Sequence, residues 1–135
     1  MKIDGGCHCG AIAYEADIDP DMVRICNCTD CQRLSGTAFR VMVRVGEDDF
    51  RIVSGTPKVY VKTAESGNKR AQAFCDQCGT HIYATSAGDE GPKSYGIRLG
   101  TARQFRELAP TAMMWGRSAL PWLGTIPDLP SRETQ

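Results

Sequence analysis

Seven cysteines in three short groups constrain this 135-residue chain more than any other feature of its sequence. The groups are Cys7-His8-Cys9, then Cys26-Asn27-Cys28-Thr29-Asp30-Cys31, then Cys75-Asp76-Gln77-Cys78 followed by Gly79. Spacings this tight are typical of metal ligands. An odd number of cysteines, with no apolar export segment in residues 1–6, does not suit a disulfide framework. We therefore expect a cytoplasmic protein whose thiols bind metal or take part in chemistry.

The first and last groups fit one closed metal site. A Cys-x-x-Cys-Gly turn, as in Cys75 to Gly79, points backbone amides at the sulfurs and uses glycine for a positive φ. Cys7 and Cys9 project to the same side of an extended segment, because side chains alternate there with a period of two. The spacing therefore predicts a structural zinc held by four thiolates, those of Cys7, Cys9, Cys75 and Cys78.

The middle group predicts a second zinc site of a different kind. Cys26, Cys28 and Cys31 lie within six residues. Three is the number of protein ligands typical of a zinc site whose fourth position stays open to water or substrate. We therefore expect two zinc ions per chain. The closed site should be needed for folding and the open site for function.

Three other interpretations of the middle group stay open. Both metals could only staple the fold, with His8 or His81 completing the second site. The cysteines could form disulfides on oxidation. This would leave one thiol unpaired and would require an oxidising compartment, whereas a cytoplasmic protein is expected. Cys26, Cys28 and Cys31 could instead have a redox role, which requires a metal-free thiol of low pKa.

The ligand set of the middle group favours thiol chemistry over hydrolysis. Three thiolates on a zinc(II) ion leave a negatively charged site, which acidifies bound water less than neutral ligands would. The sequence also lacks the pattern of a zinc deaminase, because neither histidine is followed two residues later by glutamate and Phe74, not proline, precedes Cys75. A coordinated thiol stays deprotonated, so the metal would supply the nucleophile.

The hydrophobic pattern predicts an all-β, mostly antiparallel domain with few short helical turns. In the clearest strand, residues 39–45, Phe39, Val41, Val43 and Val45 should face the core while Arg40, Met42 and Arg44 face water. Further strands are expected at residues 11–16, 50–53, 59–63, 71–74, 81–85 and 95–100. Residues 29–34 should form a short helix, with Thr29 and Gln32 as a capping box and Gly36 as its stop. Residues 102–108 are a second helical candidate.

Length and charge set the class of protein. One domain spanning residues 1–135 is expected, with an irregular tail over about residues 115–135. The formal net charge of zero gives no electrostatic attraction for nucleic acid or an anionic membrane. The longest stretch without a charged residue is 12 residues, 77–88, too short to span a bilayer. Neither nucleic acid nor a membrane is therefore an expected partner.

The cysteine groups and their flanks resemble a known family. The matching segments are Gly6-Cys7-His8-Cys9-Gly10-Ala11-Ile12 with Tyr14, Cys26 to Arg33 with Ser35-Gly36 and Ala38-Phe39, and Phe74-Cys75 with Cys78-Gly79-Thr80. They resemble the glutathione-dependent formaldehyde-activating enzymes, a family also known through centromere protein V. The similarity runs from about Gly5 to residues 118–122.

The resemblance implies a fold, two metal sites and an activity. The fold would be of the β-tent kind, with a structural zinc on Cys7, Cys9, Cys75 and Cys78 and a catalytic zinc on Cys26, Cys28 and Cys31. The family activity is a carbon–sulfur lyase reaction that interconverts S-(hydroxymethyl)glutathione with glutathione and formaldehyde. The implied partner is therefore a small thiol such as glutathione.

Other residues complete the hypotheses from sequence. Arg33, two residues after Cys31, could bind a substrate carboxylate, or it could be a solvated helix charge. His8 is expected to be an exposed part of the first cysteine turn. Trp115, Arg117 and Trp122 could wall a pocket or form dimer contacts, which makes a homodimer possible. The alternative function is a non-catalytic, zinc-stapled binding module, which predicts an apolar surface around Trp115 and Trp122.

Overall fold

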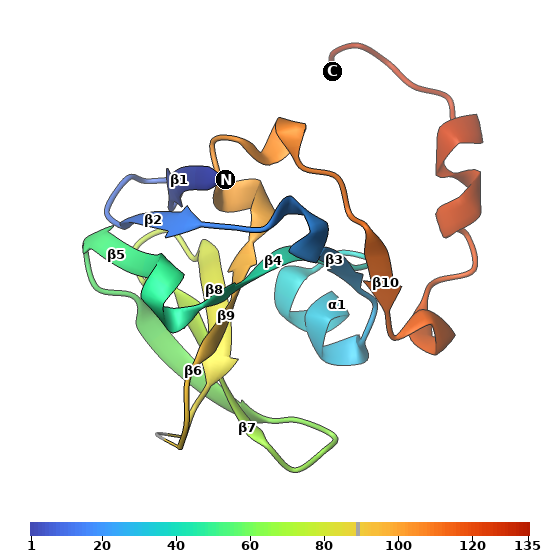
Figure 1. Ribbon diagram of the computed structural model, residues 1–135. Coiled ribbons are helices and arrows are strands. Elements are labelled where there is room, and N and C mark those ends of the chain that lie inside the picture. Colours follow the sequence, from blue (N-terminus) through green and yellow to red (C-terminus); the bar gives the residue numbers. More distant parts are fainter. Residues whose placement is uncertain (89) are drawn as a thin grey trace.

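A computed structural model of the chain describes residues 1–88 and 90–135. In these residues a three-stranded sheet, of order β1-β2-β5, lies beside a seven-stranded sheet of order β10-β3-β4-β9-β8-β7-β6 (Figure 1). The strands are β1 Lys2–Gly6, β2 Ala13–Asp17, β3 Val23–Cys26, β4 Arg40–Gly46, β5 Phe50–Ser54, β6 Lys58–Thr63, β7 Lys69–Phe74, β8 His81–Ser86, β9 Ser94–Arg98 and β10 Ala112–Met114.

The all-β, mostly antiparallel fold is confirmed. Every strand pair of the two sheets is antiparallel except that of β10 with β3, which is parallel. The helix is α1 Thr29–Ser35. Short 3₁₀ turns occupy η1 Pro20–Met22, η2 Glu47–Asp49, η3 Leu99–Thr101, η4 Phe105–Glu107, η5 Gly116–Ser118 and η6 Leu123–Asp128. No helix of the described residues is long and apolar enough to cross a bilayer.

Each strand expected from the sequence has a counterpart, but β1, β3 and β10 were not predicted. β1 ends in two glycines, and glycine is typical of loops and uncommon in strands. β3 and β10 have four and three residues and are strands because β3 pairs with β4 and β10 pairs with β3. Strands this short carry too few alternations for a periodic signal.

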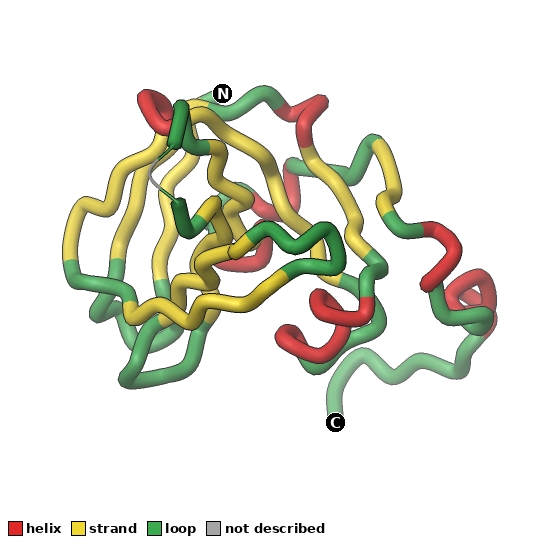
Figure 2. The backbone as a smooth tube through the Cα atoms, turned by 90° about the horizontal axis from the view of Figure 1, so that it is seen from below, coloured by secondary structure: helices red, strands yellow, loops and turns green. Residues whose placement is uncertain are grey.

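The two helical predictions and the tail need adjustment. Helix α1 begins and ends within one residue of its expected limits, and Gly36 caps it with φ 67°. The capping box was wrong: the N-cap is Cys28, whose sulfur accepts a hydrogen bond from the Cys31 amide. Residues 102–108 form only the turn η4. The tail is not wholly irregular, since it holds η5 and η6, and it curves away from the sheets beyond β10 (Figure 1, Figure 2).

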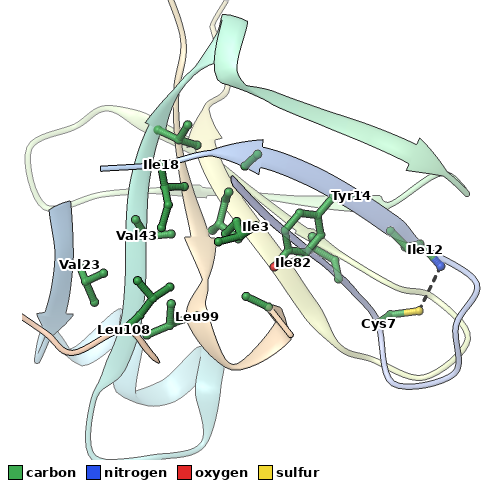
Figure 3. Close-up of a cluster of buried hydrophobic side chains, with 14 of the residues drawn as sticks. Ile3, Cys7, Ile12, Tyr14, Ile18, Val23, Val43, Ile82, Leu99 and Leu108 are labelled. Carbon is green, nitrogen blue, oxygen red and sulfur yellow. Dashed lines mark hydrogen bonds between the residues drawn. The ribbon is translucent and has the colours of Figure 1, made fainter. Parts of the chain in front are cut away.

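The hydrophobic core joins the two sheets. Buried side chains from β1, β2, β3, β4, β8 and β9 form one cluster, which includes Tyr14, Val43 and Ile82 (Figure 3). The Tyr14 hydroxyl lies 2.9 Å from Thr101 Oγ1. Gly5 allows this contact, because a Cβ there would lie 2.2 Å from the Thr101 carbonyl oxygen and 2.6 Å from the Tyr14 hydroxyl. These contacts join β1 to β2 and to the turn η3.

The second face of β4 differs from the prediction. Val41, Val43 and Val45 pack in or against the core as expected. Arg40 was expected to face water, but only 6% of its surface is exposed. The reason is that this face of the large sheet is covered by α1 and the segment after β10, which enclose a cavity against it.

Candidate functional site

Four cysteines meet where the turn after β1 lies beside the turn after β7. The sulfurs of Cys7, Cys9, Cys75 and Cys78 all lie within 4.8 Å of one another. Cys7 Sγ is 3.5 Å from Cys9 Sγ, and Cys9 Sγ is 3.7 Å from Cys75 Sγ. Cys7 and Cys75 are buried. We name this set the four-cysteine cluster.

Backbone turns hold these sulfurs in place. Gly10 and Gly79 have φ values of 82° and 75°, which suit glycine. The Gly79 amide donates to the Cys75 carbonyl over 2.8 Å, and the Ile12 amide donates to Cys7 Sγ over 3.2 Å (Figure 3). The two turns are also joined directly, since the His8 amide donates to Thr80 Oγ1. The cluster therefore ties the N-terminal strand to the end of β7.

The four-cysteine cluster has the dimensions of a tetrahedral zinc site. Zinc–sulfur bonds of about 2.3 Å place the sulfurs of a tetrahedron about 3.8 Å apart. The two sulfur–sulfur distances of 3.5 and 3.7 Å are close to that value. The donor set of four thiols, two of them buried, is one that zinc favours. The residues present therefore fit the metal.

Three further cysteines meet at the start of α1. Cys26 ends β3, Cys28 caps the helix and Cys31 lies in its first turn. Their sulfurs also lie within 4.8 Å of one another. We name this set the three-cysteine cluster. Asn27, which is completely buried, fixes the backbone between them, because its amide and its side-chain Nδ2 both donate to the Met114 carbonyl over 3.1 Å.

The three-cysteine cluster favours one thiolate even by itself. A hydrogen bond from Cys31, opposed by burial and aided by the charge of Arg40, lowers the pKa of Cys26. The same hydrogen bond raises the pKa of Cys31. The pair therefore favours a thiolate on Cys26, and a thiolate is the form that a metal binds.

No histidine or carboxylate of the described residues joins the three sulfurs. His8 is exposed in the other cluster's turn, and His81 is not part of the group. His81 Nδ1 is buried without a partner, and burial, with the charges of Arg40 and Arg98, lowers the pKa of this histidine. Within the described chain the cluster thus offers three protein ligands and not four.

A cavity of about 800 Å³ opens beside the three-cysteine cluster. Cys28 and Cys31 line it, together with one face of the large sheet. Residues 63–66, from the end of β6 into the turn before β7, and residues 114–118 complete its walls. The helix α1 and the β6–β7 turn lie on the same side of this sheet (Figure 1, Figure 2).

The walls of this cavity are strongly cationic. Arg40 and Arg98 are both more than nine-tenths buried, and both donate to Gln72 Oε1, over 3.2 and 2.9 Å. Burial, reinforced by Arg40, lowers the pKa of Arg98 to about 9, so it stays charged at neutral pH. Arg44 and Arg70 line the same face of the sheet.

Two further cations at the cavity are paired. Lys62 forms an ion pair with Asp30 of α1. Arg117 lies 3.5 Å from Glu65 of the β6–β7 turn, and its guanidinium stacks over Trp115 at 4.9 Å from the ring centroid. These pairs connect three walls of the cavity.

The other predicted site residues fall in different places. Trp115 and Arg117 line the cavity, whereas Trp122 does not. Arg33 is exposed on α1 and is not among the lining residues. Arg40, Gln72 and Arg98 were missed by the sequence analysis. Only the period of two in β4 hinted at them, by placing Arg40 opposite the core face; Gln72, between two alanines, gave no signal.

Two comparisons with known proteins name the same family, and a third shows the same fold. The family model described as glutathione-dependent formaldehyde-activating enzyme matches residues 2–118. A protein of Talaromyces marneffei, provisionally named as a glutathione-dependent formaldehyde-activating enzyme, is 25% identical over 79 residues. That match covers 57% of this chain and only 41% of the relative. A crystal structure of a Rhodobacter sphaeroides protein has the same fold, with a TM-score of 0.62 and 22% identity over 82% of this chain and 99% of that one.

Proposed function

The chain belongs to the glutathione-dependent formaldehyde-activating enzyme family, and from this premise we propose that it is a zinc-dependent carbon–sulfur lyase acting on a thiol–aldehyde adduct. Glutathione is the proposed thiol and formaldehyde the proposed aldehyde. The observation that carries the proposal is the three-cysteine cluster, two of whose members face a cavity large enough for a small molecule. The cysteine-rich composition also supports a reducing, cytoplasmic location.

The proposed reaction forms or breaks one carbon–sulfur bond. In the synthetic direction the thiol sulfur attacks the aldehyde carbon, the carbonyl π electrons move to oxygen, and the proton lost by sulfur ends on that oxygen. A free thiol with a pKa of about 8.5 is only a few per cent thiolate at neutral pH. Zinc held by Cys26, Cys28 and Cys31 would keep the thiol deprotonated, which is the chemistry that the metal supplies.

The protein's own residues bind and orient the thiol. The Cys31 amide, donating to Cys28 Sγ over 3.3 Å, holds that ligand at the start of α1. The guanidinium groups of Arg40 and Arg98 balance negative charge at the cluster, because both interact electrostatically with its sulfurs. Trp115 and Arg117, which stack on each other, form another wall of the cavity.

The test replaces Cys28 by serine. Serine keeps an oxygen acceptor at the helix N-cap but removes the thiolate. We expect two zinc ions per wild-type chain by elemental analysis, and one in Cys28→Ser. Wild-type protein should exchange formaldehyde with glutathione faster than the protein-free reaction, as measured by exchange NMR at equilibrium, and Cys28→Ser should not.

The matched control lies on the same helix. Arg33→Gln removes an exposed charge outside the cavity and should exchange like the wild type. The lyase assignment fails when wild-type protein exchanges no faster than Cys28→Ser at equal fold stability.

A second candidate function is a protein-binding module. The observation that favours it is the exposed apolar surface of the tail, where Trp122, Ile126 and Leu129 are 49%, 44% and 59% exposed. A homodimer through this tail is the simplest case. Sedimentation of the wild-type protein and of Trp122→Ser tests the homodimer. A wild-type dimer that the substitution dissociates supports it, whereas two monomeric proteins contradict it.

A further inference from the structure

We propose that Arg40 and Arg98 form a receptor for a carboxylate of the ligand, and that the cavity selects a thiol bearing at least two acidic groups. For the thiol the inference rests on the proposed function; for the carboxylate it rests on the cavity itself. The argument begins with two buried guanidinium groups that lack a carboxylate. Within residues 1–88 and 90–135, no aspartate or glutamate forms an ion pair with either arginine.

The two arginines are held in position with donors to spare. Both donate to the same neutral acceptor, Gln72 Oε1. Arg40 Nη2 and Arg98 Nε are buried and have no hydrogen-bond partner in the structure. A buried donor without a partner costs free energy, and a buried charge without a counter-ion costs more. A carboxylate would satisfy both arginines, since their forked donors match its two oxygens.

The charge of the cavity points to more than one anionic group. Lys62 and Arg117 are paired with Asp30 and Glu65, but Arg40, Arg44, Arg70 and Arg98 have no such partner among the described residues. A zinc site of three thiolates carries a single negative charge. Arg44 is exposed to solvent, so three guanidinium groups, those of Arg40, Arg70 and Arg98, face that single negative charge. One carboxylate would leave the cavity positive, whereas two bring it near neutrality.

The room for such a ligand is the cavity of about 800 Å³, which is bounded on one side by the large sheet. Gln72, Ala84, Gly96 and Arg44 are neighbours in one row across β7, β8, β9 and β4. The two middle residues are small, and Ala84 lines the cavity. At Gly96 an added Cβ would lie 3.0 Å from Met42 Sδ. Met42 Sδ and Arg98 Nη1 therefore cover Gly96, and the row meets the cavity at Ala84 and at its polar ends, Gln72 and Arg44.

The experiment separates carboxylate binding from chemistry at the thiol. S-methylglutathione keeps both carboxylates but has no free thiol, and its diethyl ester lacks both charges. Calorimetric titration of zinc-loaded protein at fixed pH and ionic strength should show that the diester binds more weakly than the acid, by about tenfold or more. Glutarate, a plain dicarboxylate, should compete with S-methylglutathione.

Variants assign the effect to the two arginines. Arg98→Gln and Arg40→Gln should each weaken binding of S-methylglutathione by about tenfold and reduce its preference over the diester. Arg51→Gln, an exposed arginine on β5 outside the cavity, should leave binding unchanged. Zinc content should stay at the wild-type value, which separates a loss of ligand binding from a loss of the metal clusters.

Each result decides between the possible roles. Equal binding of acid and diester, or no binding of S-methylglutathione and glutarate, overturns the receptor. Loss of zinc from the arginine variants with unchanged discrimination would assign them to the metal cluster instead. Carboxylate-dependent binding without catalysed exchange of formaldehyde would support the receptor and remove the lyase function, so the two proposals fail separately.

Discussion

At the scale of single residues, the grouping of the cysteines into two clusters follows from the sequence and the cavity does not. Cys75 and Cys78 could be paired with Cys7 and Cys9 because short cysteine spacings permit few arrangements. Arg40 could not be assigned, because its environment is created by α1 and by residues 114–118, which approach it only in the folded chain. Local patterning predicts which face a side chain takes and not what covers that face.

Two glycines, Gly5 in β1 and Gly10 in the cysteine turn that follows it, should respond differently to alanine. At Gly10, φ is 82° but an added Cβ meets nothing within 4 Å, so Gly10→Ala should cost only about 1 kcal/mol of backbone strain. At Gly5 the Cβ would lie 2.2 Å from the Thr101 carbonyl oxygen, so Gly5→Ala should cost about 3 kcal/mol or more. Urea unfolding of both variants measures the difference. Equal costs would contradict the close approach at Gly5.

His81 should make stability depend on pH. Burial and the charges of Arg40 and Arg98 lower its pKa below the ordinary 6.5. Below that ordinary value the unfolded chain takes up a proton that the folded protein resists, so stability falls as the pH falls. Between about pH 7.5 and about pH 5.5, wild type should lose more free energy of unfolding than His81→Gln. Parallel losses in the two proteins would contradict the lowered pKa, since acid effects on the metal sites are common to both.

At the scale of elements, pairing in the folded chain created what the sequence did not show. β10 is a strand because it lies parallel to β3, and the Met114 carbonyl at its end receives two hydrogen bonds from Asn27. The chain then reverses at Trp115, which has φ 56° and is the one non-glycine residue of the described chain with positive φ. A bulky residue in this conformation is uncommon, and such strain often marks functional sites. Here Trp115, in this backbone conformation, forms part of the cavity wall.

Substitutions at Trp115 can separate backbone strain from the contacts of the ring. Trp115→Ala and Trp115→Gly both remove the indole, but only glycine adopts the left-handed conformation without cost. We expect Trp115→Gly to be more stable than Trp115→Ala by about 1 kcal/mol in urea unfolding. Both should bind S-methylglutathione equally weakly. An alanine variant at least as stable as the glycine variant would show that the backbone relaxes there.

At the scale of the whole molecule, a net charge of zero conceals separated charges. The cavity at the three-cysteine cluster is cationic, whereas a hollow of about 630 Å³ on the small sheet is lined by acidic residues, namely Asp4, Glu15, Asp17, Asp48 and Asp49. Composition reports only the sum of these charges. It showed no excess charge for a polyanion, and it could not show where charges of one sign gather on the folded chain.

The two clusters should differ in their effect on the whole fold. The four-cysteine cluster joins β1 to β7 and so links the two sheets. A structural zinc is worth about 10–16 kcal/mol in small peptides, comparable to the roughly 5–15 kcal/mol net stability of a domain. Cys75→Ser should therefore give unfolded or insoluble protein, whereas Cys28→Ser should stay folded. Circular dichroism with elemental analysis checks this; a folded Cys75→Ser protein lacking zinc would contradict it.

The clusters also differ in how much of the chain each one needs. Cys26, Cys28 and Cys31 are complete as soon as a growing polypeptide has passed its thirty-first residue, whereas the other cluster cannot close before Cys78 has been made. During synthesis on the ribosome the three-cysteine cluster is thus complete before the four-cysteine cluster. With zinc in both clusters, as proposed, the order of metal loading would follow the order of synthesis, and the four-cysteine cluster would be the last to be filled.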